Sequence, residues 1–140
     1  MPVLQKCVAA LAARMPKVIS PKAHAIIDYA TIATFGLLAG LYWHRNRRAA
    51  LAAIISGGAQ LTTVLLTDFP GGMADIITLP THVKIDFGLA AGASAMPTFM
   101  GFDDEPEAKW FRILGLEITT VAAMTDSGEF RRESRRRRAA

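Results

Sequence analysis

The sequence predicts an all-α integral membrane protein, a four-helix bundle made of two tandem helical hairpins with an amphipathic helix before them. Three observations predict it. The 140 residues are 51% hydrophobic, the charged residues gather at both ends and in two short internal stretches, and a 58-residue shift aligns the chain with itself. A soluble domain of this length buries only about 70% of the surface that its unfolded chain exposes. Four long apolar segments therefore exclude an ordinary soluble enzyme, and the high apolar content excludes a disordered chain.

The first 18 residues predict an amphipathic helix that lies on a membrane surface. Apolar side chains recur there at helical spacing: Leu4, Val8, Leu11, Met15 and Val18. The stretch is too short and too basic for a signal peptide. Cys7 stands alone, so the sequence predicts neither a disulfide framework nor a cysteine metal site.

Four apolar segments follow, and each approaches the roughly 20 residues that cross a bilayer. They run over residues 23–43, 49–67, 79–102 and 110–125. The second contains no charged residue. The fourth is the weakest candidate because Glu117 lies in its middle. The sequence therefore predicts four membrane spans in residues 19–126.

The distribution of Lys and Arg predicts the orientation. Ten of the 16 Lys and Arg residues precede the first span or follow the last one, whereas the connection between the second and third spans has none. The positive-inside rule then places both termini in the cytoplasm, although the basic cluster at 45–48 argues for the opposite side.

The segment 127–140 is a basic tail that we expect to bind anionic lipid headgroups rather than nucleic acid. Its arginines are Arg131, Arg132, Arg135, Arg136, Arg137 and Arg138. A tail that leaves a membrane helix meets headgroups first.

The 58-residue register predicts a duplication of residues 19–68 as residues 77–126. It aligns chemically distinctive residues: His24 with His82, Asp28 with Asp86, Gly57 with Gly115, and Thr67-Asp68 with Thr125-Asp126. Each repeat is then a hairpin that enters and leaves on one side, and the two hairpins are related by a pseudo-two-fold axis along the membrane normal.

This topology gathers a polar ring at one membrane face. We expect it to contain His24, Asp28, Asp68, His82, Asp86 and Asp126. The interpretation with fewest assumptions is a structural clasp, in which Asp68 and Asp126, placed unfavourably at helix C-termini, bond to histidines of neighbouring helices. A divalent metal site, a haem held by His24 and His82, or a proton path are the alternatives.

Glu117 has no counterpart in the first repeat, where Ala59 takes its place. A carboxylate in mid-membrane is costly unless it is protonated, paired or facing water. Gln60 lies near the corresponding depth and is its expected partner. Small residues at Gly36 and Gly40, and at Gly88, Gly92 and Ser94, predict close helix contacts within the bundle, with a face for another membrane protein as the alternative.

The chain resembles bacterial four-helix membrane proteins related to the SPW-repeat family. The similarity lies in Ile19-Ser20-Pro21 with His24, Ile27-Asp28-Tyr29, Leu66 to Gly71, and His82 with Ile85-Asp86-Phe87. The stretch Ser94 to Phe102 resembles the Ser-Pro-Trp segment of that family, with Met96-Pro97-Thr98 in place of the tripeptide. The resemblance implies a four-helix fold in a bacterial inner membrane and no particular activity.

Two functions remain open from the sequence. The first is a non-enzymatic accessory or assembly subunit, packed against other subunits of a respiratory or photosynthetic membrane complex. The second is a self-contained metal-binding, haem-binding or small transport protein that uses the two His-x3-Asp motifs. A haem, a pigment or a divalent metal are possible cofactors, but the sequence requires none of them.

Overall fold

The computed structural model describes residues 7, 10 and 14–128, and four long helices make up most of that part. The helices are α2 (Pro21–Tyr42), α3 (Arg47–Leu65), α4 (Leu79–Met100) and α5 (Ala108–Met124). Every predicted helix boundary lies within two residues of the observed one. The predicted N-terminal helix lies largely outside the described residues, and so do the six arginines of the tail.

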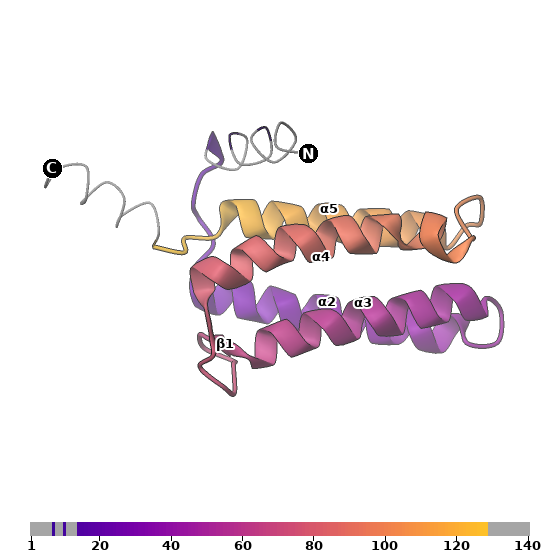
Figure 1. Cartoon of the computed structure of the whole chain (residues 1–140), viewed down its shortest axis with the longest axis horizontal. Coiled ribbons are helices and arrows are strands. Elements are labelled where there is room, and N and C mark those ends of the chain that lie inside the picture. Colours follow the sequence, from indigo (N-terminus) through magenta and orange to yellow (C-terminus); the bar gives the residue numbers. More distant parts are fainter. Residues whose placement is uncertain (1–6, 8–9, 11–13, 129–140) are drawn as a thin grey trace, which may run out of the picture.

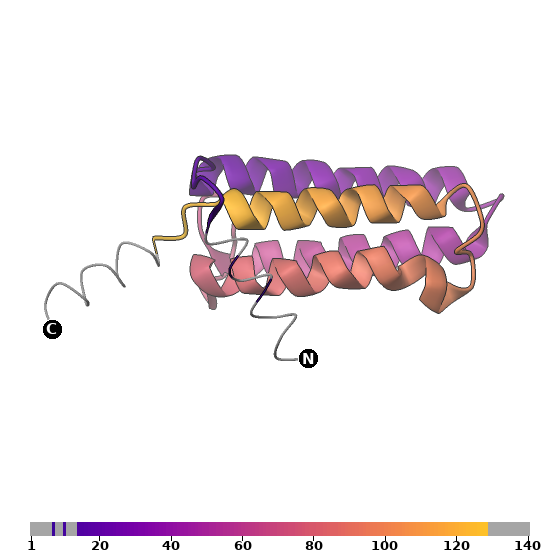
Figure 2. The same cartoon turned by 90° about the horizontal axis from the view of Figure 1, so that it is seen from above.

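The helices form two antiparallel hairpins, α2–α3 and α4–α5, which stack as two layers (Figure 1). Seen from above, α5 lies beside α2, and α4 lies over α3 (Figure 2). At the base end of the bundle, α2 and α4 begin and α3 and α5 end. At the loop end, residues 43–46 and 101–107 close the two hairpins.

Local signals explain where the helices start and stop. The hydroxyl of Ser20 accepts a hydrogen bond from the backbone N–H of Ala23, which caps the start of α2. Asn46 caps α3 in the same way. Gly101 ends α4 with a φ of 72°, a left-handed conformation that glycine adopts without strain.

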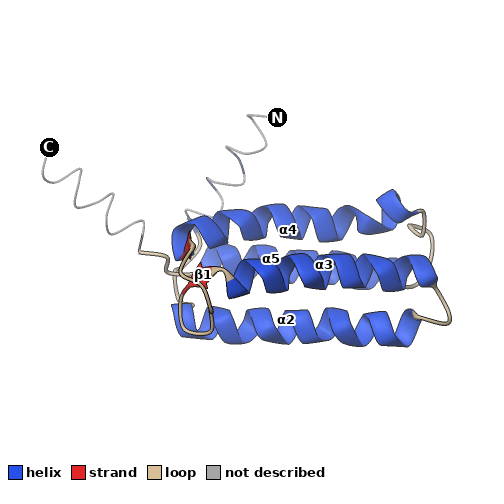
Figure 3. Cartoon of the chain, turned by 60° about the horizontal axis from the view of Figure 1, so that its bottom comes forward, coloured by secondary structure: helices blue, strands red, loops and turns tan. Residues whose placement is uncertain are grey.

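Short parallel pairings tie the base end together (Figure 3). Strand β1 (Thr67–Asp68) pairs with β2 (Ile77–Thr78), so that Thr67 lies beside Ile77. Ile19 pairs with Thr125 in the same parallel sense. The two pairings correspond in the 58-residue register, because Thr67 aligns with Thr125 and Ile19 aligns with Ile77. Each one joins the end of one helix to the start of another.

Small residues allow close contact between the helices of each hairpin, but of the predicted positions only Ser94 takes part, against Gly115. A Cβ at Gly57 would lie 2.8 Å from the Cβ of Phe35, and a Cβ at Gly115 would lie 2.7 Å from the carbonyl oxygen of Ala90. By contrast, a Cβ at the predicted contact glycines would meet nothing within 4 Å: Gly36, Gly40, Gly88 and Gly92. The prediction was wrong for these four glycines because small-residue spacing identifies a helix face without identifying what the face contacts.

Two of the described helices, α2 and α3, are long and apolar enough to cross a membrane. Helix α5 has 17 residues and a length of about 26 Å, short of the roughly 30 Å of bilayer hydrocarbon. Helix α4 has 22 residues, but His82, Lys84 and Asp86 in its first turns lower its hydropathy. The structure therefore shows an all-helical bundle with two membrane-compatible helices.

Candidate metal centre

Four polar side chains converge inside the base end of the bundle: His24 and Asp28 of α2, and His82 and Asp86 of α4. The i, i+4 spacing places each His-Asp pair on one helix face. All four are buried, with exposed fractions of 0–3%. One ligand atom from each residue lies within 4.8 Å of the others, so a single ion can contact all four.

The four side chains form a closed ring in which imidazoles and carboxylates alternate. His24 Nε2 lies 3.2 Å from Asp28 Oδ2 and 3.2 Å from Asp86 Oδ2. His82 Nε2 lies 3.1 Å and 3.3 Å from the same two oxygens. Each imidazole therefore contacts the carboxylate of its own helix and that of the other helix.

Two threonines hold the outer nitrogens of the imidazoles. Thr125 Oγ1 lies 2.6 Å from His24 Nδ1, and Thr67 Oγ1 lies 2.7 Å from His82 Nδ1. Each hydroxyl also donates to the carbonyl oxygen four residues earlier, at 2.6 Å. Because a hydroxyl has one proton, it accepts from Nδ1–H. In a neutral imidazole, the Nε2 that faces the carboxylates then carries a lone pair.

This arrangement leaves polar atoms that need a proton or a cation. In the described part of the chain, His24 Nε2 makes no hydrogen bond of acceptable geometry, and Asp86 Oδ1 has no partner. Asp28 Oδ1 accepts from Gln60 Nε2 at 3.3 Å. A buried polar atom left without a partner costs about 1–3 kcal/mol. A lone pair that faces two carboxylate oxygens adds repulsion to that cost.

The donor set matches a divalent transition metal. A tetrahedral ion with bonds of about 2.0–2.1 Å separates its ligand atoms by about 3.3–3.4 Å. The four N–O contacts of the ring, at 3.1–3.3 Å, are close to this separation, and the N–N and O–O separations are at most 4.8 Å. Two carboxylates and two neutral imidazoles together balance the charge of one divalent ion. Mg²⁺ and Ca²⁺ fit poorly because they take about six or more ligands, mostly oxygens.

The same ring leaves no room for a haem between the two histidines, which was one of the alternatives that the sequence left open. A haem must separate the two ligating imidazoles with its flat macrocycle. Here the ring centroids of His24 and His82 lie 5.1 Å apart, and both carboxylates occupy the space beside the two Nε2 atoms.

Phe69 covers the two histidines from the base end. It follows β1, is half-buried, and its ring centroid lies 6.3 Å from that of His24 and 5.2 Å from that of His82. Sequence reasoning missed Phe69 and also missed Thr67 and Thr125. The 58-residue register did match the two Thr-Asp pairs, which was the signal that pointed to these threonines.

Asp68 and Asp126 lie outside the group of four, so the predicted clasp between these aspartates and the histidines was wrong. Asp68 is exposed at the end of β1. The N–H of Asp126 donates to the carbonyl oxygen of Ile19, and its Oδ1 accepts from the N–H of Gly128. Adjacent residues of an extended segment point in opposite directions, so when Thr67 faces inward, Asp68 faces out.

The predicted pair of Glu117 and Gln60 was also wrong. Gln60 is buried and bonds to Asp28 across its own hairpin. Glu117, half-buried in the middle of α5, has its Oε2 3.1 Å from the hydroxyl of Thr31. That hydroxyl also lies 3.0 Å from the carbonyl oxygen of Ile27. Glu117 and Gln60 therefore each bond to a residue of α2 rather than to each other.

At the loop end, the basic residues of the first hairpin contact acidic residues of the second. Arg48 forms an ion pair with Glu105 and donates to the carbonyl oxygen of Gly101. The side chain of Asn46 donates to Glu105, and Arg45 lies 3.9 Å from Glu107. The basic cluster at 45–48 thus faces a neutralising acidic loop.

No protein-family model, curated protein or solved structure matches this chain. The resemblance to the SPW-repeat family stays a prediction.

Proposed function

We propose that this chain is a non-enzymatic, multi-pass protein of the bacterial inner membrane, in which two copies of one helical hairpin bind a divalent transition metal ion. The observation that carries the proposal is the buried ring of two imidazole nitrogens and two carboxylate oxygens, with contacts of 3.1–3.3 Å. The threonine hydrogen bonds leave the Nε2 atoms for the ion. Outer hydrogen bonds of this kind orient histidine ligands in metal sites.

The surface of the bundle supports the membrane placement. Large apolar side chains are exposed along the helices: Leu37, Leu41, Ile54, Ile55, Ile113 and Leu116. Apart from Asp28, Asp86 and Glu117, every charged residue of the four helices lies in the first two turns. A water-soluble bundle would carry charges along its outer faces.

The duplication is supported by contacts that repeat at the 58-residue interval. Thr67 and Thr125 each hold one histidine, and each pairs with the isoleucine that begins a repeat. Gly57 and Gly115 each allow close contact within their hairpin. In this arrangement each copy supplies one His and one Asp to a shared ion, so one hairpin alone would have half a site.

The orientation of the chain in the membrane is proposed from the basic residues that flank the base end. Both tails leave the bundle there (Figure 1), and we place that end in the cytoplasm because most of the Lys and Arg residues flank it. The basic cluster at 45–48 argues for the opposite orientation, but acidic residues of the facing loop neutralise part of its charge. A C-terminal fusion to a reporter that works only in the periplasm should be inactive, and an active fusion would refute this orientation.

Elemental analysis of the full chain, purified in mild detergent without added metal or chelator, tests the metal site. We expect one equivalent of a divalent transition metal. His24→Ala and His82→Ala should each lose it, whereas His44→Ala should retain it, because His44 is exposed at the loop end. Asp68→Asn is the matched control for Asp86→Asn. If the folded protein binds none of the supplied divalent ions, the metal proposal is refuted, and the ring is a structural clasp of protonated histidines and aspartates.

One observation favours a second function, that of an accessory subunit of a larger membrane complex. Glu117 is only half-buried, in the middle of α5, where it follows the exposed Leu116 and lies about one turn after the exposed Ile113. A carboxyl partly facing hydrocarbon is better placed against another protein. Native purification followed by mass spectrometry should then recover other membrane polypeptides, and Glu117→Leu should weaken their retention. An isolated monomer or homodimer would contradict this function.

A further inference from the structure

The two carboxylates of the metal centre differ in their outer oxygens. Asp28 Oδ1 accepts a hydrogen bond from Gln60 Nε2 at 3.3 Å. Asp86 Oδ1 is buried and has no hydrogen-bond partner in the described part of the chain. Their inner oxygens, by contrast, make equivalent contacts with the two histidines. The two oxygens that face the histidines are thus equivalent, whereas the two outer oxygens differ in their hydrogen bonding.

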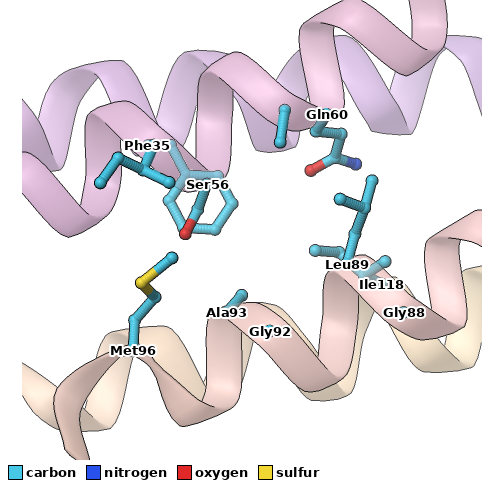
Figure 4. A pocket seen from close by; sticks show the side chains of 11 residues that line it. Phe35, Ser56, Gln60, Gly88, Leu89, Gly92, Ala93, Met96 and Ile118 are labelled. Atoms are coloured by element: carbon cyan, nitrogen blue, oxygen red, sulfur yellow. The ribbon is translucent and has the colours of Figure 1, made fainter. Parts of the chain in front are cut away.

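The 58-residue register explains this difference. Gln60 lies 32 residues after Asp28, and the residue 32 positions after Asp86 is Ile118. Ile118 is buried, with an exposed fraction of 4%, and its side chain cannot donate a hydrogen bond. Gln60 and Ile118 line the same cavity of about 90 Å³ between the two layers (Figure 4). The second repeat therefore lacks the donor that restrains its carboxylate.

A carboxylate oxygen that accepts a hydrogen bond has one lone pair fewer for a metal ion, and the hydrogen bond fixes its orientation. An oxygen without a partner can turn toward the ion, and a carboxylate that binds through both oxygens is a common ligand mode. Binding of this kind would also remove the cost of about 1–3 kcal/mol for an unsatisfied buried acceptor. Both considerations favour chelation by Asp86 and single-oxygen binding by Asp28.

We infer that the ion is five-coordinate, bound by two imidazoles, one oxygen of Asp28 and both oxygens of Asp86, with Gln60 as the positioning residue that sets this asymmetry. The inference rests on the proposed metal function. It also names the class of ion. Mn²⁺ and Fe²⁺, which take five or six ligands, gain from the extra oxygen, whereas the tetrahedral preference of Zn²⁺ does not need it. The asymmetry thus shifts selectivity away from Zn²⁺.

The wild-type protein loaded with Co²⁺ alone gives the first test. Tetrahedral Co²⁺ absorbs strongly in the visible range and five-coordinate Co²⁺ absorbs less, so we expect the weaker five-coordinate spectrum. Ile118→Gln supplies the missing donor and should give the stronger tetrahedral spectrum. It should also lower the ratio of Mn²⁺ to Zn²⁺ affinity by about 10-fold, the usual lower bound for outer-shell changes. Ile118→Met, which adds no donor, is the matched control and should behave as wild type.

Gln60→Leu works in the opposite direction and covers the case in which Ile118→Gln does not fold. It frees Asp28 Oδ1 and should weaken the Co²⁺ absorption further. A tetrahedral spectrum in the wild type, or equal spectra in wild type, Gln60→Leu and Ile118→Gln, would overturn the asymmetry while leaving the metal site in place. Failure of the wild type to bind any of Co²⁺, Mn²⁺ and Zn²⁺ would instead overturn the proposed function, and this inference with it.

Discussion

Replacing His82 by alanine separates a metal centre from a metal-free clasp. His82 has no exposed surface, and its Nε2 contacts both carboxylates of the ring. The substitution removes one of the ligands and leaves Thr67 without its imidazole partner. His44→Ala removes an exposed imidazole at the opposite end of the bundle, so it controls for the loss of a histidine.

The expected loss of metal affinity follows from the number of ligands. Structural Zn²⁺ sites with four ligands bind with about 10–16 kcal/mol, which is about 2.5–4 kcal/mol per ligand when shared equally. At about 1.4 kcal/mol for each factor of ten, His82→Ala should weaken binding about 100- to 1,000-fold. Free metal at 100 times its Kd should stabilise the wild-type protein by about 2.7 kcal/mol. His82→Ala should lose nearly all of that gain.

The assay measures thermal unfolding in detergent, with Zn²⁺ or Mn²⁺ and with a chelator. Wild type and His44→Ala should unfold at a lower temperature when the chelator is present. His82→Ala should unfold at the same low temperature under both conditions. A clasp held by protons alone makes a different prediction, since His82→Ala would lower the wild-type stability but the chelator would change nothing. A chelator-insensitive wild type would therefore refute the metal assignment.

Three further predictions concern other parts of the molecule and other conditions. Gly115→Ala should lower the unfolding temperature because its Cβ would lie 2.7 Å from the Ala90 carbonyl oxygen. Gly92→Ala has nothing within 4 Å of the new Cβ and should raise helix stability by up to about 1 kcal/mol. Equal effects of the two substitutions would contradict the close contact at Gly115. Glu117→Gln keeps a partner for Thr31 and removes a carboxyl from mid-helix, so the unfolding temperature should stay the same or rise, and a clear decrease would show that the charge is needed. Acidification should release the bound ion, because protons compete for the imidazole and carboxylate ligands; dialysis over a pH series followed by elemental analysis measures this, and a metal content independent of pH would count against the ligand set.

Much of the fold could be predicted from the sequence because apolar runs and helix-ending residues act locally. Ser20 and Asn46 cap their helices through bonds to residues three positions away, and Gly101 ends α4 by its own backbone conformation. The i, i+4 spacing of His24 and Asp28 is equally local. The four residues of the ring were therefore among the six that the sequence predicted to meet at one end of the bundle.

The sequence by itself determined the four helices, the paired His-x3-Asp motifs and the apolar surface, since each depends on neighbours within a few turns. Only the tertiary structure decided which residues bond to the histidines. Thr67 faces the interior and Asp68 faces out because successive side chains of an extended segment alternate, and parallel pairing with Ile77 sets that direction. Likewise Gly57 and Gly115, rather than the evenly spaced glycines, carry the close contacts. Which face of a helix meets another depends on packing between segments far apart in the chain.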